Sequence, residues 1–274
     1  MKSIRRIVAL THITFIEGIR DRALYGITIV ALMMLATNIL FTNLFGHELG
    51  KIMVDLNLST ISFAGLLLTF FVNINLMSKD IDRQTIYCVL SKPFSRGEYI
   101  VGKYLGLLSL MITAIFLLTV CSGGIAWFVK NSVADYFFRT FSWTCYAQAI
   151  LYIMLMFTML NAVVIFFSSI STSAFLTVLF SVATYIVGQS IEEVAFFFKG
   201  EAVTAGYSSK FNEFLIDSFQ YVVPNFSAFD IKTMASHGKL MSMNHTIALI
   251  GYTVIYSLLL LFFASHIFKR REFN

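Results

Sequence analysis

The stretch YLGLLSLMITAIFLLTVCSGGIAWFV, residues 104–129, runs for 26 residues without an Asp, Glu, Lys or Arg. An α-helix rises 1.5 Å per residue, so about 20 apolar residues cross the roughly 30 Å hydrocarbon core of a bilayer. The stretch is therefore long and apolar enough to span a membrane. It does not fit a membrane barrel, whose strands are alternating segments of about ten residues.

Five further apolar runs of similar length lie at about 23–45, 58–78, 143–168, 173–191 and 245–268. The chain of 274 residues is 58% hydrophobic and 13% charged, whereas about a quarter of a soluble domain is charged. We therefore predict an all-α polytopic membrane protein with six transmembrane helices in a single domain, residues 1–274. The three cysteines are scattered and predict neither a disulfide framework nor a metal site.

The charges distinguish the two sides of the membrane. With six spans both termini lie on one side, and the segments of that side hold 13 of the 20 Lys and Arg residues. The opposite segments hold nine of the 15 Asp and Glu residues. Because cytoplasmic segments carry the excess of Lys and Arg, we predict cytoplasmic termini. The net charge of +5 reflects this orientation and does not predict nucleic-acid binding, which requires a clustered basic face.

Residues 1–22 precede the first span and form an amphipathic pattern. Apolar side chains share one side of the helical wheel, at Ile4, Ile7, Val8, Thr11, Phe15 and Ile19. Polar and charged side chains occupy the other side, at Arg5, Arg6, His12, Glu17 and Arg20, and Asp21 and Arg22 complete the segment. A helix of this kind suits the inner membrane interface, with its cations facing anionic headgroups. An ordinary basic flank of the first span remains an equal alternative.

Between spans two and three, Gly97 is followed after four residues by Gly102 and Lys103, the spacing of an ATP-binding phosphate loop. A phosphate loop lies between a strand and a helix, and its Lys is followed by a Ser or Thr that holds Mg²⁺. Here Tyr104 follows Lys103, and a membrane span comes next. We therefore predict that this chain has no catalytic residues for ATP hydrolysis and no cofactor of its own.

The same inner loop, residues 79–103, has the pattern of a short amphipathic helix. Asp80 or Asp82 can cap a helix N-terminus, and Pro93 ends the segment in a turn. Between them, aliphatic residues and cations recur at helical spacing. A plain connector seldom shows this pattern, so we interpret the loop as a docking element for a partner.

No Asp, Glu, Lys or Arg lies well inside a predicted span. Ion-driven carriers usually place ionisable groups near the midplane, so this pattern favours an external source of energy. The spans also lack the paired acids or Ser–His pair of an intramembrane enzyme. The polar exceptions are Asn38, Asn73, Asn75, Gln148 and Asn161. We interpret them mainly as interhelical hydrogen-bond partners.

The largest outer segment, residues 199–243, predicts short helices between spans five and six. Phe214 and Phe219 fall near helical spacing, and Pro224 stops the run. These three residues form either an outer gate or a lid that only packs. Farther along the segment and just beyond it, three residues of types that bind copper occur, at Met241, Met243 and His245. Their spacing imposes no closed site, so the sequence leaves metal binding open.

The stretch DIDRQTIYCVLSKPFSRGEYIVGKYLG, residues 80–106, resembles the segment after the second span of type-2 ABC exporter permeases. More narrowly, it resembles the branch that contains the permease NosY of copper-enzyme maturation systems. Three further stretches are similar to segments of that family in the same order: EGIRDRALY (17–25), PNFSAFD (224–230) and FKRREF (268–273). The four motifs together cover the length of the chain. An Asp stands in the loop where many members have Glu.

This resemblance implies a permease that couples a separate ATPase to substrate movement in a bacterial inner membrane. The resemblance also implies that two permease copies form a homodimer, which would pair with two ATPase copies that bind the ATP and Mg²⁺. The residues implied in ATPase coupling are Asp80, Asp82, Arg83, Thr85, Leu90, Pro93, Arg96 and Lys103. Alternatives are a permease for copper-enzyme maturation and a self-contained channel or carrier. The sequence does not identify the substrate.

Overall fold

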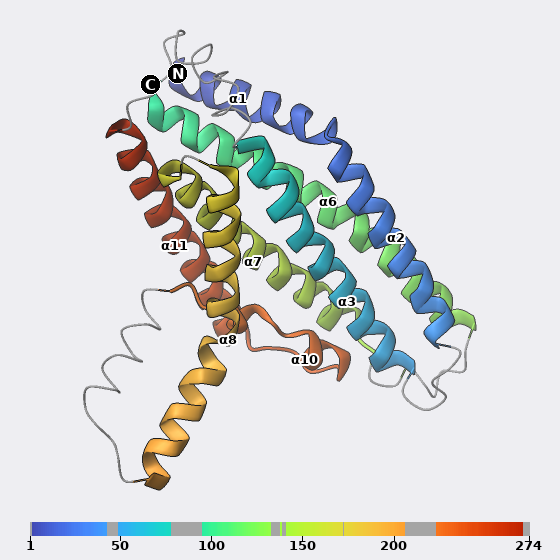
Figure 1. Cartoon of the computed structure of the whole chain (residues 1–274). Coiled ribbons are helices and arrows are strands. Elements are labelled where there is room, and N and C mark those ends of the chain that lie inside the picture. The colour runs from blue at the N-terminus through green and yellow to red at the C-terminus, as the bar shows by residue number, and fades with distance from the viewer. Residues whose placement is uncertain are drawn as a thin grey trace.

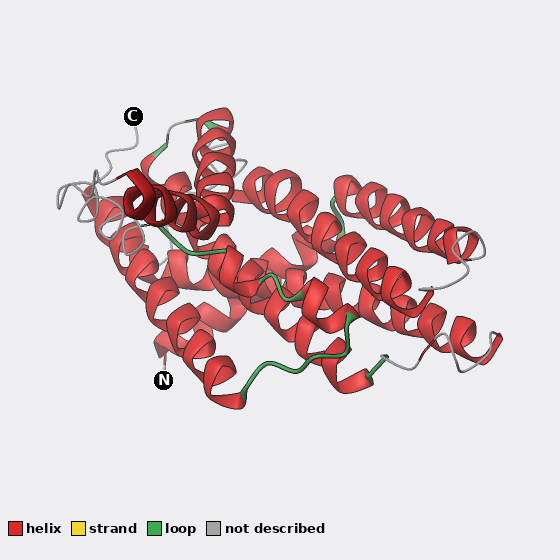
Figure 2. Ribbon diagram, turned by 90° about the horizontal axis from the view of Figure 1, so that it is seen from below, coloured by secondary structure: helices red, strands yellow, loops and turns green. Residues whose placement is uncertain are grey.

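The structure, a computed structural model, describes residues 2–42, 49–77, 95–132, 138, 141–171, 173–205 and 223–270. Throughout these ranges the regular structure is helical, and the helices are joined by short connections (Figure 2). Six helices are long and apolar enough to cross a membrane. The predicted all-α fold with six spans is confirmed.

The six candidate spans follow the predicted order along the chain. They cover Arg22–Leu40, Leu49–Met77, Arg96–Ser132, Trp143–Ile170, Ala174–Val194 and Met243–Lys269. The helices that contain them are α2 (Arg22–Thr42), α3 (Leu49–Leu67) with its continuation η1 (Leu68–Asn73), α6 (Arg96–Ser132), α7 (Trp143–Ile170), α8 (Ala174–Ala205) and α11 (Met243–Arg270). Both termini lie at one end of this bundle, and α8 extends beyond its opposite end (Figure 1).

Helix α6 begins earlier than hydropathy indicates. The sequence analysis starts the third span at Tyr104, whereas the helix begins at Arg96, so the last eight residues of the predicted loop 79–103 form its first two turns. Its 37 residues correspond to about 55 Å, well beyond the hydrocarbon thickness. The helix therefore extends beyond the hydrocarbon core into an aqueous or interfacial setting. A hydropathy window detects only the apolar part of such a helix.

Helix α1 (Lys2–Ile19) is separate from the first span. A turn at Arg20 and Asp21 divides it from α2, and α1 runs along the first half of α6 near the termini (Figure 1). The predicted segment 1–22 thus contains one helix plus the first residue of α2. That α1 is a helix agrees with the amphipathic pattern, and its position in the membrane interface remains a prediction.

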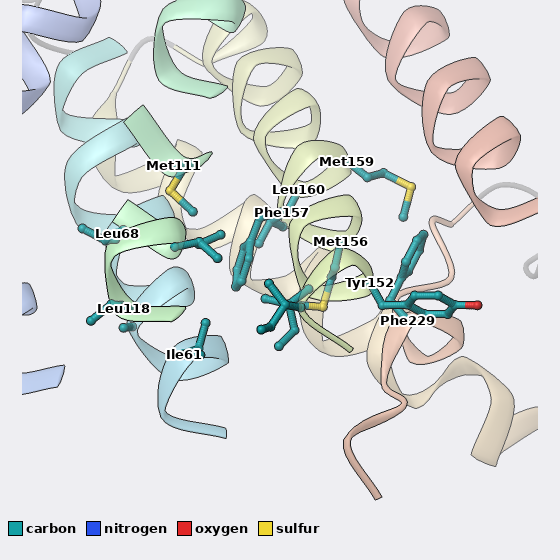
Figure 3. Packing of buried hydrophobic residues seen from close by; sticks show 14 of the residues in the cluster. Ile61, Leu68, Met111, Leu118, Tyr152, Met156, Phe157, Met159, Leu160 and Phe229 are labelled. Carbon is teal, nitrogen blue, oxygen red and sulfur yellow. The ribbon is translucent and has the colours of Figure 1, made fainter. Parts of the chain in front are cut away.

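Helices α3 and α7 form the centre of the bundle. Two thirds of the most apolar part of each is buried, whereas less than a third of the corresponding part of α2, α8 and α11 is buried. The contact between α3 and α7 is close because Gly65 faces the ring of Phe157, where a Cβ would lie 2.3 Å from a ring carbon. Leu68, Met111 and Leu160 belong to the same buried core as this ring (Figure 3). A glycine at residue 65 is therefore required by this crossing.

A π-helical segment, η1, interrupts the regular α-helix directly after this crossing. A π-helix contains one extra residue per turn, and such bulges are often found at functional sites. Its last residue, Asn73, is fully buried, and the four residues after it lead to Met77, the final described residue before the inner loop. The sequence analysis contains no prediction of this bulge.

Among the residues described between α8 and α11, two short helices occur: η3 (Ser227–Phe229) and α10 (Lys232–Ser236). They lie on the side of the bundle away from the termini (Figure 1). Their presence agrees with the short outer helices predicted for residues 199–243. The apolar run that contains Phe214 and Phe219 lies outside the described residues.

Candidate functional site

A guanidinium group joins the start of α6 to the end of α11, the helix that leads to the C-terminus. Arg96 Nη1 donates hydrogen bonds of 2.9 Å to the carbonyl oxygens of Phe268 and Lys269. The last carbonyls of a helix have no partner within the helix, and a cation there also meets the negative end of the helix dipole. One helical turn later, the ring of Tyr99 stacks on Phe268 with centroids 5.6 Å apart. The start of α6 is therefore fastened to the end of α11.

The start of α6 is also capped by its own side chains. The backbone N–H of Glu98 donates to Ser95 Oγ at 3.2 Å, and the backbone N–H of Ser95 donates to Glu98 Oε2 at 2.9 Å. This reciprocal pair is a capping box, which satisfies two free donors at a helix N-terminus. The signal, Ser followed three residues later by Glu, is visible in the sequence, and our sequence analysis missed it.

Glu98 connects this capped end to α1. Its carboxylate accepts a hydrogen bond from Ser3 Oγ and lies 3.8 Å from Arg6 Nη1. The contact continues along α6, where Gly102 and Gly106 face α1. A Cβ on Gly106 would lie 2.5 Å from Thr14 Cβ, so the two helices approach as closely as small residues allow.

Lys103 is buried in this crossing, with 2% of its surface exposed. Its ammonium nitrogen lies 3.7 Å from Glu17 Oε2 on α1. A buried charge is tolerated in a protein when it is paired. The resemblance assigned Lys103 to ATPase coupling, but the structure places it between two helices of its own chain. Of the interfacial residues, Glu17 therefore holds α1 to α6.

Asp21 occupies the corner between α1 and α2. Its Oδ1 accepts a hydrogen bond of 2.8 Å from the backbone N–H of Ala23, as an N-cap of α2 does. Its Oδ2 accepts a longer bond of 3.5 Å from Asn75 Nδ2, close to the end of the second span. Arg20 is exposed at the same corner and Arg22 opens α2. Asp21 thus ties the corner to the last described turn before the inner loop.

The inner loop is therefore anchored at both of its described edges. Asn75 lies three residues before Ser78, and the capping box of Ser95 follows Phe94 directly. Residues 78–94 lie outside the described residues. The coupling assignments that fall within that range stay predictions: Asp80, Asp82, Arg83, Thr85, Leu90 and Pro93.

The polar residues within the spans form interhelical hydrogen bonds, as predicted. Asn38 Nδ2 on α2 donates to Asn57 Oδ1 on α3 at 3.0 Å, and Asn73 Nδ2 donates to Asn161 Oδ1 on α7 at 3.4 Å. Gln148 on α7 bonds both backbone groups of Met241, at 3.0 and 3.1 Å. These bonds offset part of the cost of placing amides among apolar helices. Within the described residues, the buried Oδ1 of Asn73 and Nδ2 of Asn161 have no hydrogen-bond partner.

At the opposite end of the bundle, an aromatic segment lies against α8. The backbone N–H of Phe226 donates to the carbonyl oxygen of Gly188 at 2.9 Å, and a Cβ on Gly188 would lie 2.2 Å from the carbonyl oxygen of Pro224. Phe226 and Phe229 are both buried. Of the predicted gate, only Pro224 is described. The sequence analysis missed the two buried phenylalanines, because hydropathy does not separate a docked aromatic from a lipid-facing one.

The possible copper ligands do not converge in the described structure. Met243 is 73% exposed, Met241 packs against the core, and His245 Nδ1 lies 3.2 Å from the hydroxyl oxygen of Tyr152. Among the described residues, no group of three or more His, Cys, Asp or Glu is placed to hold a metal ion. The arrangement gives no support to a metal site at these residues.

A family model described as "ABC-2 family transporter protein" matches residues 8–273, nearly the whole chain. No curated protein matches the chain. The match agrees with six spanning helices and with the resemblance of the inner loop to the permeases of ABC transporters. The chain belongs to the ABC-2 transporter family and is a membrane component of an ABC transporter.

Proposed function

We propose that the chain is the permease subunit of an ATP-driven exporter in a bacterial inner membrane. A separate ATPase binds the inner loop, hydrolyses ATP with Mg²⁺ and moves the spans. Family membership and the phosphate-loop argument, in which Tyr104 follows Lys103, support a separate motor. The narrower likeness to the branch that contains NosY remains a prediction about the substrate.

The observation that carries this proposal is the network around the inner loop. Arg96, Glu98 and Lys103 connect α6 to α11 and α1, and Asp21 connects the corner of α1 and α2 to Asn75. A force applied between Met77 and Ser95 would therefore reach four helices together. Transmission of this kind needs contacts that differ between two states of the partner, as in rigid-body switching.

The proposed orientation places this network in the cytoplasm. Lys2, Arg5 and Arg6 belong to the same end of the molecule as Lys269 and Arg270. An excess of cations marks the cytoplasmic side of membrane proteins. This orientation puts the inner loop where a cytoplasmic ATPase can bind it.

We further propose that two copies of the chain form a homodimer that pairs with two ATPase copies. Large apolar side chains are exposed along α2 and α8, and a second copy or lipid must cover them. Cross-linking of single cysteines introduced along α2 and α8 would give disulfide-linked dimers at helical intervals. Cross-linking only at random collision rates would exclude a dimer through these helices.

Copurification with an ATPase encoded beside this chain, followed by reconstitution, tests the main proposal. We expect Leu90→Asp and Arg96→Glu to abolish substrate-stimulated ATP hydrolysis while the chain still inserts in the membrane. Lys239→Glu, at an exposed residue of the other end, is the matched charge-reversal control and leaves stimulation unchanged. Full stimulation in both loop variants would refute the coupling role, and transport without ATP would favour a self-contained channel or carrier.

A further inference from the structure

A small cavity lies between three spans and the outer segment. Its walls come from Ser62 on α3, Met156 on α7, Gln189 on α8 and the residues Phe229–Lys232. Figure 3 shows Met156 and Phe229 at this side of the core. The cavity has a volume of about 50 Å³. It lies in the half of the bundle away from the termini, where α10 packs on the spans (Figure 1).

The volume decides what kind of group can enter. One water molecule needs about 10–15 Å³ of such space, so the cavity has room for about three to five waters or one small polar group. Sites for complete drug-sized molecules enclose about 300–1,000 Å³. A larger ligand would therefore place only its polar end in this cavity and leave the rest outside.

The walls combine an acceptor with a pair of opposite charges. Within the described part of the chain, the buried Oε1 of Gln189 accepts no hydrogen bond. Lys232 Nζ lies 3.2 Å from Asp230 Oδ2, and both side chains stay partly exposed at the cavity. A buried acceptor without a donor is unfavourable, so a ligand N–H would stabilise it. The charge pair complements a group that carries a cation and an anion a few ångströms apart.

The helices that line the cavity also expose apolar side chains. Phe63 follows Ser62 on α3 and is 46% exposed, and Ile186, next to the lining residue Tyr185 on α8, is 57% exposed. In a membrane these side chains contact lipid or a second copy of the chain. A ligand that extends from the cavity along this surface would therefore have an apolar body, as a lipid does.

We propose that this cavity binds the head group of an amino-phospholipid. The ammonium donates hydrogen bonds to Gln189 Oε1 and Asp230, while the phosphate lies near the ammonium of Lys232. This inference deepens the proposed function, since it names a lipid as the substrate class. Only the claim that the lipid is transported rests on the proposed function, because binding of the lipid needs neither ATP nor an ATPase.

Native mass spectrometry of the purified chain, released from vesicles with equal amounts of phosphatidylethanolamine and phosphatidylcholine, tests the proposal. The two head groups differ by three methyl groups that remove the N–H donors. We expect at least tenfold preferential retention of phosphatidylethanolamine. Gln189→Leu and Asp230→Asn should each reduce this preference at least fivefold. Thr184→Val is the control, because the Thr184 hydroxyl bonds its own helix at Phe180.

Thermal unfolding is measured for each variant, so that lipid retention is compared only between folded proteins. Gln189→Leu should not lower stability, since it removes a buried acceptor that lacks a donor. Equal retention of both lipids, or an unchanged preference in both variants, would overturn the proposal. Binding of soluble phosphoethanolamine without any retained lipid would also overturn it in favour of a water-soluble ligand. If the ATPase failed to associate with the chain, the proposed permease function would be contradicted, whereas the evidence for lipid binding would be unchanged.

Discussion

The two ends of the helix bundle are held together by different forces. At the end with the termini, helix ends are connected through ions and caps, among them Arg96, Glu98 and Lys103. At the opposite end, Phe226 and Phe229 are buried by aromatic and apolar packing against α7, α8 and α11. Directional polar bonds fix the orientation of helix ends, whereas apolar packing fills space. The first arrangement suits a place where force enters, and the second suits the closure of an outer surface.

The largest effect is expected at the apolar end. Phe226→Ala removes a fully buried ring from the contact with Gly188 and Tyr185, and such a substitution costs about 3–5 kcal/mol. Thermal unfolding in detergent measures the loss. Phe175→Ala is the matched control, because Phe175 is 71% exposed, and it should change the midpoint little. Equal midpoints for both variants would show that the outer segment contributes no packing energy.

An intermediate effect is expected where α1 crosses α6. Gly106→Ala places a methyl group against Thr14, and overpacking of this kind costs about 1–3 kcal/mol. Gly124→Ala on the same helix has no neighbour within 4 Å and should be neutral or slightly stabilising. The difference between their unfolding midpoints tests whether α1 packs on the protein. Identical midpoints would mean that α1 does not lie against Gly106.

The smallest effect is expected at the capping box. Ser95→Ala removes the acceptor for the Glu98 N–H, and loss of an N-cap costs about 1 kcal/mol. Ser132→Ala, at the other end of α6, removes only a bond from Ser132 Oγ to the Phe128 carbonyl and serves as control. A larger drop in unfolding midpoint for Ser95→Ala than for Ser132→Ala would show that polar capping stabilises the start of α6, at the end of the bundle with the termini. A Ser132 effect as large as that of Ser95 would contradict it.

The sequence was sufficient to predict the spans but not the faces through which they pack. A length of apolar chain specifies a crossing because the bilayer thickness is fixed. In a membrane, however, both the protein-facing and the lipid-facing sides of a helix are apolar. On α1 the side that packs is Leu10, Thr14 and Gly18, while Ile4 and Val8 of the predicted apolar side are exposed. The packed side of α1 combines Leu10 with the smaller Thr14 and Gly18, so hydropathy alone does not identify it.

The candidate site was predicted in part. The pattern of the inner loop located the region, and the structure adds a close approach of α1 to Gly102 and Gly106 on α6. For Arg96 and Lys103 the family resemblance implies a role in ATPase coupling, which stays a prediction. Their partners within the chain, the end of α11 and Glu17, lie far along the chain. Such pairings depend on tertiary contacts that no local pattern contains.

The sequence by itself determined the number and order of spans and the absence of a phosphate loop, because both depend on local length, charge and spacing. The tertiary structure decided the burial of Lys103, the π-helical bulge of η1 and the docking of Phe226 on Gly188. Each of these depends on which helix lies next to which, and that is set by the fit of small and large side chains across distant segments.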